Sequence, residues 1–398
     1  MDSLPSELVV NEISRLLLQI DKQLLRRVNK KLHSLFVYKE IKFNKTKINL
    51  VHLIKYKKLW DKRTADFLAQ KGYLDFLKYA HENGCPWNEK ITTSAAKYGN
   101  LDCLKYAREN GCRWDGEITR QSALNGHLDC LKYAHENGCS WNEHTTKSAT
   151  ENCHLDCLKY AHENGCPWDD RITYSAAENG NLDCLKYSHE NGCPWHEDTT
   201  YYAAKNGYLD CLKYAHENGC PWHKGTTKSA AFNGDLYCLK YAHENGCTWH
   251  EDTIQYAALG GYLDCLKYAH ENGCSWHYSA TTFSAALNGH LDCLKYAHEN
   301  GCHWDEDTTK YAALNGHLDC LKYAHDNGCP WDVETSRYAA EKGHLDCLKY
   351  AHENGCPCDT RTTYNAAKYG HLDCLQYATE NRFPRNEDVD EAINNLHL

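Results

Sequence analysis

A 27-residue period constrains this chain more than any other feature of its sequence. Variants of LDCLKYAHENGCPW recur, with the first leucine at residues 74, 101, 128, 155, 182, 209, 236, 263, 291, 318, 345 and 372. Ten of the eleven spacings are 27 residues, and one is 28 because residues 277–282 add a position. A unit this short cannot bury its apolar side alone, so twelve such units are expected to stack in series.

Each unit is predicted to contain two short helices. In residues 169–195, Gly180 and the Asn191–Gly192 pair interrupt the pattern. Glycine is favoured just past a helix end because it adopts positive φ easily. We expect Thr173, or the residue before it, to cap one helix that Gly180 ends, and Asn181 to cap a second helix from Leu182 to Glu190. No segment alternates with period two, so the predicted class is all-α, a helix-pair solenoid.

Charge and hydropathy exclude several protein classes. The 398-residue chain has a mean hydropathy of −0.74 and no apolar run near the ~20 residues of a membrane helix. Its N-terminus, MDSLPSELVVNEI, lacks a basic-then-apolar leader, so we expect a cytoplasmic and not a secreted protein. Residues 1–60 carry a net charge of +8 and the rest −18. Without zinc-finger or RNA-binding signatures, that basic segment does not predict a nucleic-acid partner.

The 24 cysteines form two series within the repeat. Eleven occupy the third position of the LDC motif and eleven follow Asn-Gly, leaving Cys153 and Cys358. Equivalent cysteines lie one stacking distance apart, ~8–10 Å, which is too far for a disulfide ladder. Cys130, His135 and Cys139 offer zinc-like ligands, but other units lose one of these ligand types. We therefore expect buried, free thiols, with no metal and no cofactor.

Histidine and tryptophan positions also recur. We expect the histidine of HENGC to bond a terminal backbone carbonyl. Six histidines of the GHLD type, which alternate with Asn, Tyr and Asp, are expected to be helix caps. They are residues 127, 154, 290, 317, 344 and 371. The tryptophan that closes each unit is expected to fill a gap, with its indole N–H bound to a partner.

The helix pair resembles that of the ankyrin repeat. The matching residues in one unit are Ala312, Ala313, Gly316, His317, Leu318, Asp319, Leu321, Lys322, Asn327 and Gly328. The resemblance extends over residues 61–382. The ankyrin period is about 33 residues and begins with a hairpin, and the whole deficit here falls in that hairpin. The resemblance therefore implies an ankyrin-like solenoid without β-hairpin fingers, similar to the short, cysteine-rich repeats of giant DNA viruses and their amoebal hosts.

Residues 4–35 resemble the F-box. The matching residues are Leu4, Pro5, Glu7, Leu8, Ile13, Leu17, Asp21, Leu24, Val28, Asn29, Lys30 and Leu35, while Leu32 replaces the common tryptophan. The resemblance implies that Leu4, Pro5, Leu8, Ile13, Leu17, Leu24, Val28 and Leu35 contact a Skp-type adaptor of a cullin-RING ubiquitin ligase. The alternative is a helical cap that shields the first repeat.

One face of the first helix varies between units. The eighth residue before each LDC leucine changes most, and the fourth also changes. Positions four apart share a helix face, so stacking aligns them into one long, exposed stripe. We predict that this stripe binds a protein target, and solvent-exposed drift is the alternative. The stripe residues are Arg120, Lys147, Tyr174, Tyr201, Lys228, Phe232, Gln255, Phe283, Lys310, Arg337 and Tyr364.

Together these features predict a binding protein with four segments. They are an F-box-like segment (1–40), a linker with a degenerate half-repeat (41–60), twelve ankyrin-like repeats (61–382) and a C-terminal cap (383–398). The sequence shows no constellation of catalytic residues, so we expect no enzyme. The predicted function is a monomeric adaptor that recruits a protein target to a ubiquitin ligase. The alternative is an ankyrin-repeat scaffold or host-interaction protein without a ligase partner.

Overall fold

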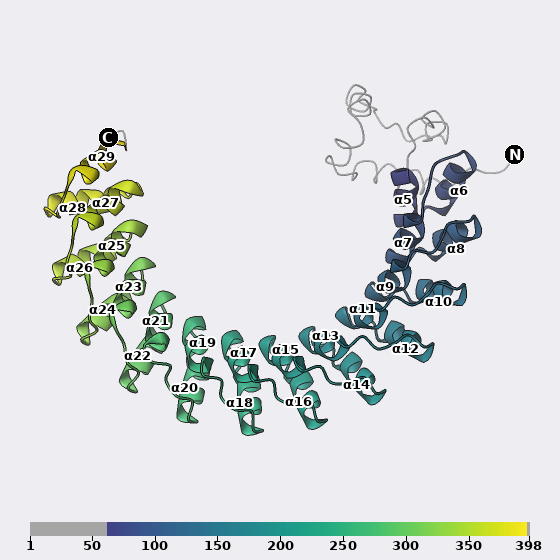
Figure 1. Ribbon diagram of the computed structural model, residues 1–398, viewed down its shortest axis with the longest axis horizontal. Helices are drawn as coiled ribbons and strands as arrows, with labels where there is room; N and C mark the ends of the chain where they lie inside the picture. The colour runs from purple at the N-terminus through teal and green to yellow at the C-terminus, as the bar shows by residue number, and fades with distance from the viewer. Residues whose placement is uncertain (1–61, 396–398) are drawn as a thin grey trace, which may run out of the picture. The chain divides into compact units, whose positions relative to one another are not determined.

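The computed structural model describes residues 62–395, which form 25 α-helices and no β-strand (Figure 1). The predicted all-α, ankyrin-like helix-pair solenoid is thereby confirmed for this part of the chain. The described residues belong to two compact units, one ending at Asp115 and the other beginning at Gly116. We call them unit 1 and unit 2.

Unit 1 contains two helix pairs. They are α5 (Lys62–Gln70) with α6 (Leu74–Glu82), and α7 (Lys90–Lys97) with α8 (Leu101–Glu109). Unit 2 continues the pattern with alternating odd- and even-numbered helices. The odd-numbered helices are α9 (Glu117–Leu124), α11 (Thr145–Glu151), α13 (Ile172–Glu178), α15 (Thr199–Lys205), α17 (Thr226–Asn233), α19 (Thr253–Gly260), α21 (Ala280–Leu287), α23 (Glu306–Leu314), α25 (Val333–Lys342), α27 (Thr360–Lys368) and α29 (Glu387–Asn395). The even-numbered helices are α10 (Leu128–Glu136), α12 (Leu155–Glu163), α14 (Leu182–Glu190), α16 (Leu209–Glu217), α18 (Leu236–Glu244), α20 (Leu263–Glu271), α22 (Leu291–Glu299), α24 (Leu318–Asp326), α26 (Leu345–Glu353) and α28 (Leu372–Glu380).

The turn between the two helices of a repeat contains the positive-φ glycine that the sequence predicts. After α13, Gly180 has a φ of 70°. Its N–H and that of Asn181 donate to the carbonyls of Ala177 and Ala176, which satisfies the last carbonyls of the helix. The predicted caps are wrong, because neither Asn181 nor Thr173 makes a side-chain bond to the start of its helix.

These side chains bond to neighbouring repeats instead. The Asn181 amide donates to the Thr150 carbonyl of the preceding repeat. The histidines at the start of even-numbered helices behave similarly: none in unit 2 caps its helix, and His371 contacts the Glu341 carbonyl at 2.8 Å. Of the even-numbered helices in unit 2, α18 alone has a side-chain cap, in which Asp235 accepts from the Cys238 N–H.

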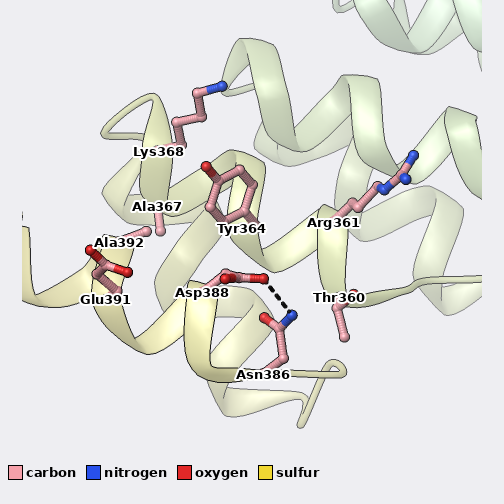
Figure 2. Close-up of a pocket in the computed structure, with 9 residues that line it drawn as sticks. All are labelled: Thr360, Arg361, Tyr364, Ala367, Lys368, Asn386, Asp388, Glu391 and Ala392. Atoms are coloured by element: carbon pink, nitrogen blue, oxygen red, sulfur yellow. Dashed lines mark hydrogen bonds between the residues drawn. The ribbon is translucent and has the colours of Figure 1, made fainter.

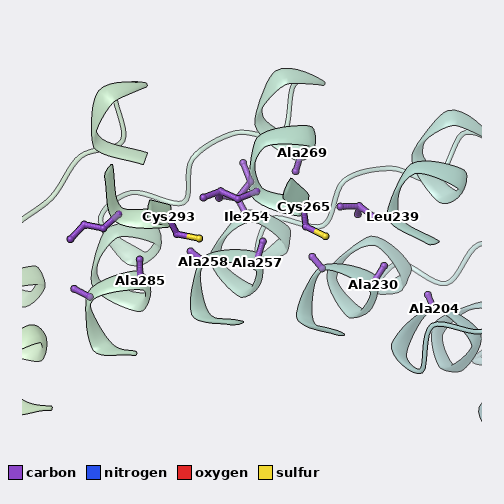
Figure 3. Packing of buried hydrophobic residues seen from close by; sticks show 14 of the residues in the cluster. Ala204, Ala230, Leu239, Ile254, Ala257, Ala258, Cys265, Ala269, Ala285 and Cys293 are labelled. Carbon is purple, nitrogen blue, oxygen red and sulfur yellow. The ribbon is translucent and has the colours of Figure 1, made fainter. Parts of the chain in front are cut away.

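Small side chains let the odd-numbered helices of unit 2 stack closely. Each packs against the next odd-numbered helix and against its own even-numbered partner, and even-numbered helices contact one another less. Figure 3 shows the resulting core, in which Ile254, Ala257 and Ala258 of α19 are fully buried beside Cys265 and Leu239. The core is therefore a continuous row through unit 2 and not a set of separate centres.

The prediction that the repeated cysteines are buried, free thiols is confirmed. All 24 thiols are free, and both repeated series are buried. Burial raises the pKa of many of them; that of Cys211, for example, rises to about 12. A thiol with so high a pKa stays protonated and behaves as a small apolar side chain.

Buried threonines hold the short connection that stands in place of a hairpin. The Thr200 hydroxyl lies 3.3 Å from the Pro221 carbonyl and accepts the His223 N–H at 2.9 Å. The Thr226 hydroxyl bonds to it as well. The same bonds recur in other repeats of unit 2, so a polar contact inside the row positions each loop.

Candidate protein-interaction surface

The structure places the predicted stripe on the odd-numbered helices of unit 2, with one residue on each from α9 to α27 and a second on α17. In helix order, the residues are Arg120, Lys147, Tyr174, Tyr201, Lys228 with Phe232, Gln255, Phe283, Lys310, Arg337 and Tyr364. Figure 1 shows these helices side by side along one side of unit 2. The sequence pattern therefore gave the correct helix for each residue.

The stripe is less exposed than predicted. Phe232 is the one member whose exposed fraction, 50%, places it on the open surface, and the others are half-buried. The Lys147 and Lys310 side chains are only 18% and 17% exposed. Long side chains on adjacent odd-numbered helices cover one another, and the sequence period does not reveal this cover.

Aromatic rings gather at the centre of the stripe. Tyr174 stacks on Tyr202 with centroids 5.2 Å apart, and Tyr201 meets Tyr202 edge-on at the same distance. The Lys205 ammonium lies 5.4 Å from the Tyr202 centroid, within cation–π range. Phe232 packs edge-on against Tyr256, with ring centroids 5.4 Å apart.

Cationic members of the stripe are paired with acids. Lys228 lies 3.3 Å from Asp252, and Arg337 pairs with Asp359. Lys310 lies 2.6 Å from Asp307 and 3.3 Å from Glu334. The bond to Asp307, which outweighs desolvation, raises the pKa of Lys310. A partner that takes these cations must therefore replace an existing ion pair.

The loops before the odd-numbered helices carry a charged network that the stripe prediction did not include. Asp169, which is 6% exposed, accepts from Arg171 at 2.9 Å and contacts His144 Nδ1 at 2.8 Å. Burial alone would raise the pKa of Asp169, but hydrogen bonds from Arg171 and His144 lower it to about 2. Asp169 therefore stays ionised and fixes this loop.

Three central repeats use histidine in the same loop position. His196, His223 and His250 accept a backbone N–H on Nδ1 from the residue two positions later, at 3.1–3.2 Å. Asp198 lies between two of them, 3.8 Å from His196 and 3.6 Å from His223. Across the described residues, no group of three or more His, Cys, Asp or Glu side chains is arranged to hold a metal ion.

The even-numbered helices carry a different cluster, which recurs in most repeats of unit 2. His216 stacks on Trp222 at 4.2 Å, and Tyr241 of the next repeat meets both rings edge-on. The Trp222 indole N–H donates to the Asn245 carbonyl at 3.0 Å, as predicted. The predicted histidine partner is wrong where the structure gives one: His243, for example, contacts the Tyr268 hydroxyl at 3.2 Å.

Figure 2 shows an open cleft at the C-terminal end of the stripe, between α27 and α29. Tyr364 and Lys368 line one wall, and Asp388 and Glu391 line the other. Asp388 is held by the Asn386 amide at 3.0 Å. Most of the lining side chains are polar or charged, unlike the mostly apolar lining of a typical small-molecule pocket.

The eight F-box-like residues, from Leu4 to Leu35, lie outside the described residues. Within the described part of the chain, no helix combines the length and apolar character needed to span a bilayer.

Comparison with known protein families finds a match to ankyrin repeats in one segment of this chain. Residues 337–379, from α25 to α28, match the family model for ankyrin repeats that occur in many copies. Comparison with curated proteins finds no match.

The solved structures that match this chain have low sequence identity to it. The human ASB11 ankyrin repeat domain is 19% identical, with 40% of this chain and 84% of that chain covered, at a TM-score of 0.35. The pentatricopeptide repeat protein PPR10, in complex with an 18-nucleotide psaJ RNA element, is 12% identical, with 85% and 60% covered, at 0.42. PPR10 from maize is also 12% identical, with 83% and 64% covered, at 0.29.

Proposed function

We propose that this chain is a protein-interaction scaffold whose stripe holds a protein target. One observation carries the proposal: the stripe changes in nearly every repeat, while the surrounding positions are mostly alanine and threonine. Tyr174, Tyr201, Gln255 and Lys310, for example, occupy equivalent positions on a common helix face. A constant framework with variable side chains is the arrangement that repeat proteins use for binding surfaces. The ankyrin-repeat match over residues 337–379 supports the same function.

The proposal also assigns a ligase link to the N-terminus. Leu4, Pro5 and the spacing through Leu35 support an F-box-like segment that binds a Skp-type adaptor. Under this proposal the repeats select the target and the N-terminal segment delivers it to a cullin-RING ubiquitin ligase. The second candidate is a scaffold without a ligase, which the ankyrin-repeat match supports equally.

A target-capture experiment tests the stripe. The full-length chain is compared with the triple variant Tyr174→Ala, Tyr201→Ala, Phe232→Ala by crosslinking and mass spectrometry in cell lysate. Central interface aromatics often contribute ~2 kcal/mol or more, so the triple variant should lose its specific partners. The control is Tyr278→Ala, which removes an aromatic that is 84% exposed and lies outside the stripe. Equal capture by all three proteins would refute a binding role for the stripe.

A separate experiment tests the ligase link. Full-length protein carrying Leu4→Ala and Pro5→Ala should lose binding to a purified Skp-type adaptor but keep its circular dichroism spectrum and its captured targets. Unchanged adaptor binding, or no binding by the unmodified chain, would leave the scaffold without a ligase partner as the function.

A further inference from the structure

Three successive even-numbered helices, α16, α18 and α20, begin with a pattern of tyrosines and aspartates that is reversed at α18. The residue before the helix is Tyr208 for α16, Asp235 for α18 and Tyr262 for α20. The second helical residue in the same helices is Asp210, Tyr237 and Asp264. At both positions tyrosine and aspartate alternate along the three helices, and each helix has tyrosine at one position and aspartate at the other. We call these six residues the Tyr–Asp patch.

The Tyr–Asp patch has no counterpart elsewhere in unit 2. The other seven even-numbered helices have histidine or asparagine before the helix and aspartate as the second residue. Tyr237 replaces that otherwise constant aspartate and is 74% exposed. Tyr208 and Tyr262 are 39% and 38% exposed. Three exposed tyrosines on consecutive repeats are more apolar surface than solubility favours, which indicates a contact site.

Two of the three tyrosine rings, those of Tyr208 and Tyr262, pack against glycines of the preceding repeat. The Tyr208 ring occupies the space that a Cβ atom on Gly180 would need, 2.5 Å away, and Tyr262 does the same at Gly234, at 2.3 Å. The Asp235 carboxylate is held at its cap by the Cys238 N–H at 2.7 Å. Rings and a carboxylate that are already in place lose little rotamer entropy on binding.

Charge selects the partner. In helix order Asp235 comes between Tyr208 and Tyr262, and the exposed Asp210 and Asp264 come on either side of Tyr237. A guanidinium group stacks on tyrosine and bonds carboxylate in two-pronged fashion, so each adjacent Tyr and Asp form a site for arginine. Neighbouring helices are ~8–10 Å apart. A polyproline II segment places residues i and i+3 on one face about 9 Å apart.

We propose that the Tyr–Asp patch binds an extended, arginine-bearing peptide segment of a partner protein, with arginine at every third residue. This surface is separate from the stripe, because none of its six residues belongs to the stripe. The inference therefore does not rest on the proposed function, and the variants below leave the stripe unchanged.

Fluorescence anisotropy with the full-length chain tests the inference. The probe is a fluorescein-labelled peptide, (Arg-Pro-Ala)₄. Its matched control has the same composition with the four arginines in one block, and a second control, (Glu-Pro-Ala)₄, reverses the charge. We expect the periodic arginine peptide to bind at least about fivefold tighter than the block peptide and the glutamate peptide not to bind.

Variants that restore the residues of other repeats separate patch binding from general attraction to an acidic chain. Tyr208→His with Tyr262→His should weaken binding about tenfold. Tyr237→Asp should weaken it about threefold, although it adds a negative charge that would strengthen general attraction. Asp235→Asn keeps a cap acceptor but loses the charge, and should weaken binding more than Asp346→Asn in α26. Tighter binding by Tyr237→Asp, or equal affinity for the periodic and block peptides, would overturn the proposal.

Discussion

The two helix rows of unit 2 differ in how much their side chains change from repeat to repeat. Even-numbered helices repeat LDCLKYAHE with few changes, whereas odd-numbered helices change at the stripe in nearly every repeat. The even-numbered row is joined by large His–Trp–Tyr clusters, and the odd-numbered row by alanine contacts and threonine hydrogen bonds. The contacts that recur from repeat to repeat therefore depend on constant residues, while the stripe adds ring contacts and ion pairs that differ between repeats.

Removing a constant core side chain should have the largest effect. Leu212 of α16 is fully buried, and Leu212→Ala should lower the free energy of unfolding by about 3 kcal/mol because it leaves a cavity. Urea unfolding followed by circular dichroism measures this change. The stripe variant Gln255→Ala should change it by less than about 0.5 kcal/mol. Equal losses would contradict the division between the rows.

The aromatic cluster should come next. Trp222→Ala removes the stack on His216 and the indole bond to Asn245, so we expect a loss of about 2 kcal/mol. The value is below that of a core tryptophan because Trp222 is half-buried. Tyr278→Ala serves as the aromatic control and should leave the melting temperature unchanged. A similar shift in both variants would show that the cluster does not join repeats.

The next prediction compares the turn residue Cys153 with the glycine that other repeats have at the same position. Cys153 has a φ of 58° where the other turns from an odd-numbered to an even-numbered helix in unit 2 have glycine, a conformation that costs non-glycine residues about 1 kcal/mol. Cys153→Gly should therefore raise the free energy of unfolding by about 1 kcal/mol. Gly180→Ala should lower it by at least as much, because the new Cβ would meet the Tyr208 ring. Differential scanning calorimetry should show that the two variants change the free energy of unfolding in opposite directions, and changes of the same sign would contradict the prediction.

The smallest expected effect depends on pH. Burial and the nearby Lys228 lower the pKa of His250, against the opposite effect of Asp252 and Glu251. The folded chain therefore binds fewer protons at His250, so its contribution is present above the ordinary pKa of about 6.5 and is lost as the pH falls through that value.

His250→Asn keeps an acceptor for the Asp252 N–H but does not titrate. It should therefore reduce the loss of stability between pH 7 and pH 5 by less than about 1 kcal/mol. Thermal melts at several pH values measure the difference, and His303→Asn, in a residue with no such bond, is the control. A larger pH-dependent loss in His250→Asn than in the unmodified chain would contradict the assignment.

The sequence predicts local structure better than contacts between repeats. The bounds Leu182–Glu190 and the buried cysteines follow from helical period and glycine position, because both depend on the unit alone. The Asn181 cap and the histidine partner could not be predicted, because the next or preceding repeat brings a better partner within reach. The cover over the stripe was also missed, since it depends on side-chain lengths on the adjacent helix.

The single irregular spacing has a consequence for how such a chain grows. The extra residue leaves Tyr278 in the loop, 84% exposed with a φ of 40°, yet the Trp276 indole still reaches the carbonyl of Asn300. That bond joins residues 24 positions apart, whereas the equivalent bonds elsewhere join residues 23 apart. The loop accommodates the extra residue, and the next repeat keeps the same indole bond to its neighbour. Duplication or loss of one whole unit in the gene would therefore supply the same partners on both sides, so the length of the array can evolve without new contacts having to arise.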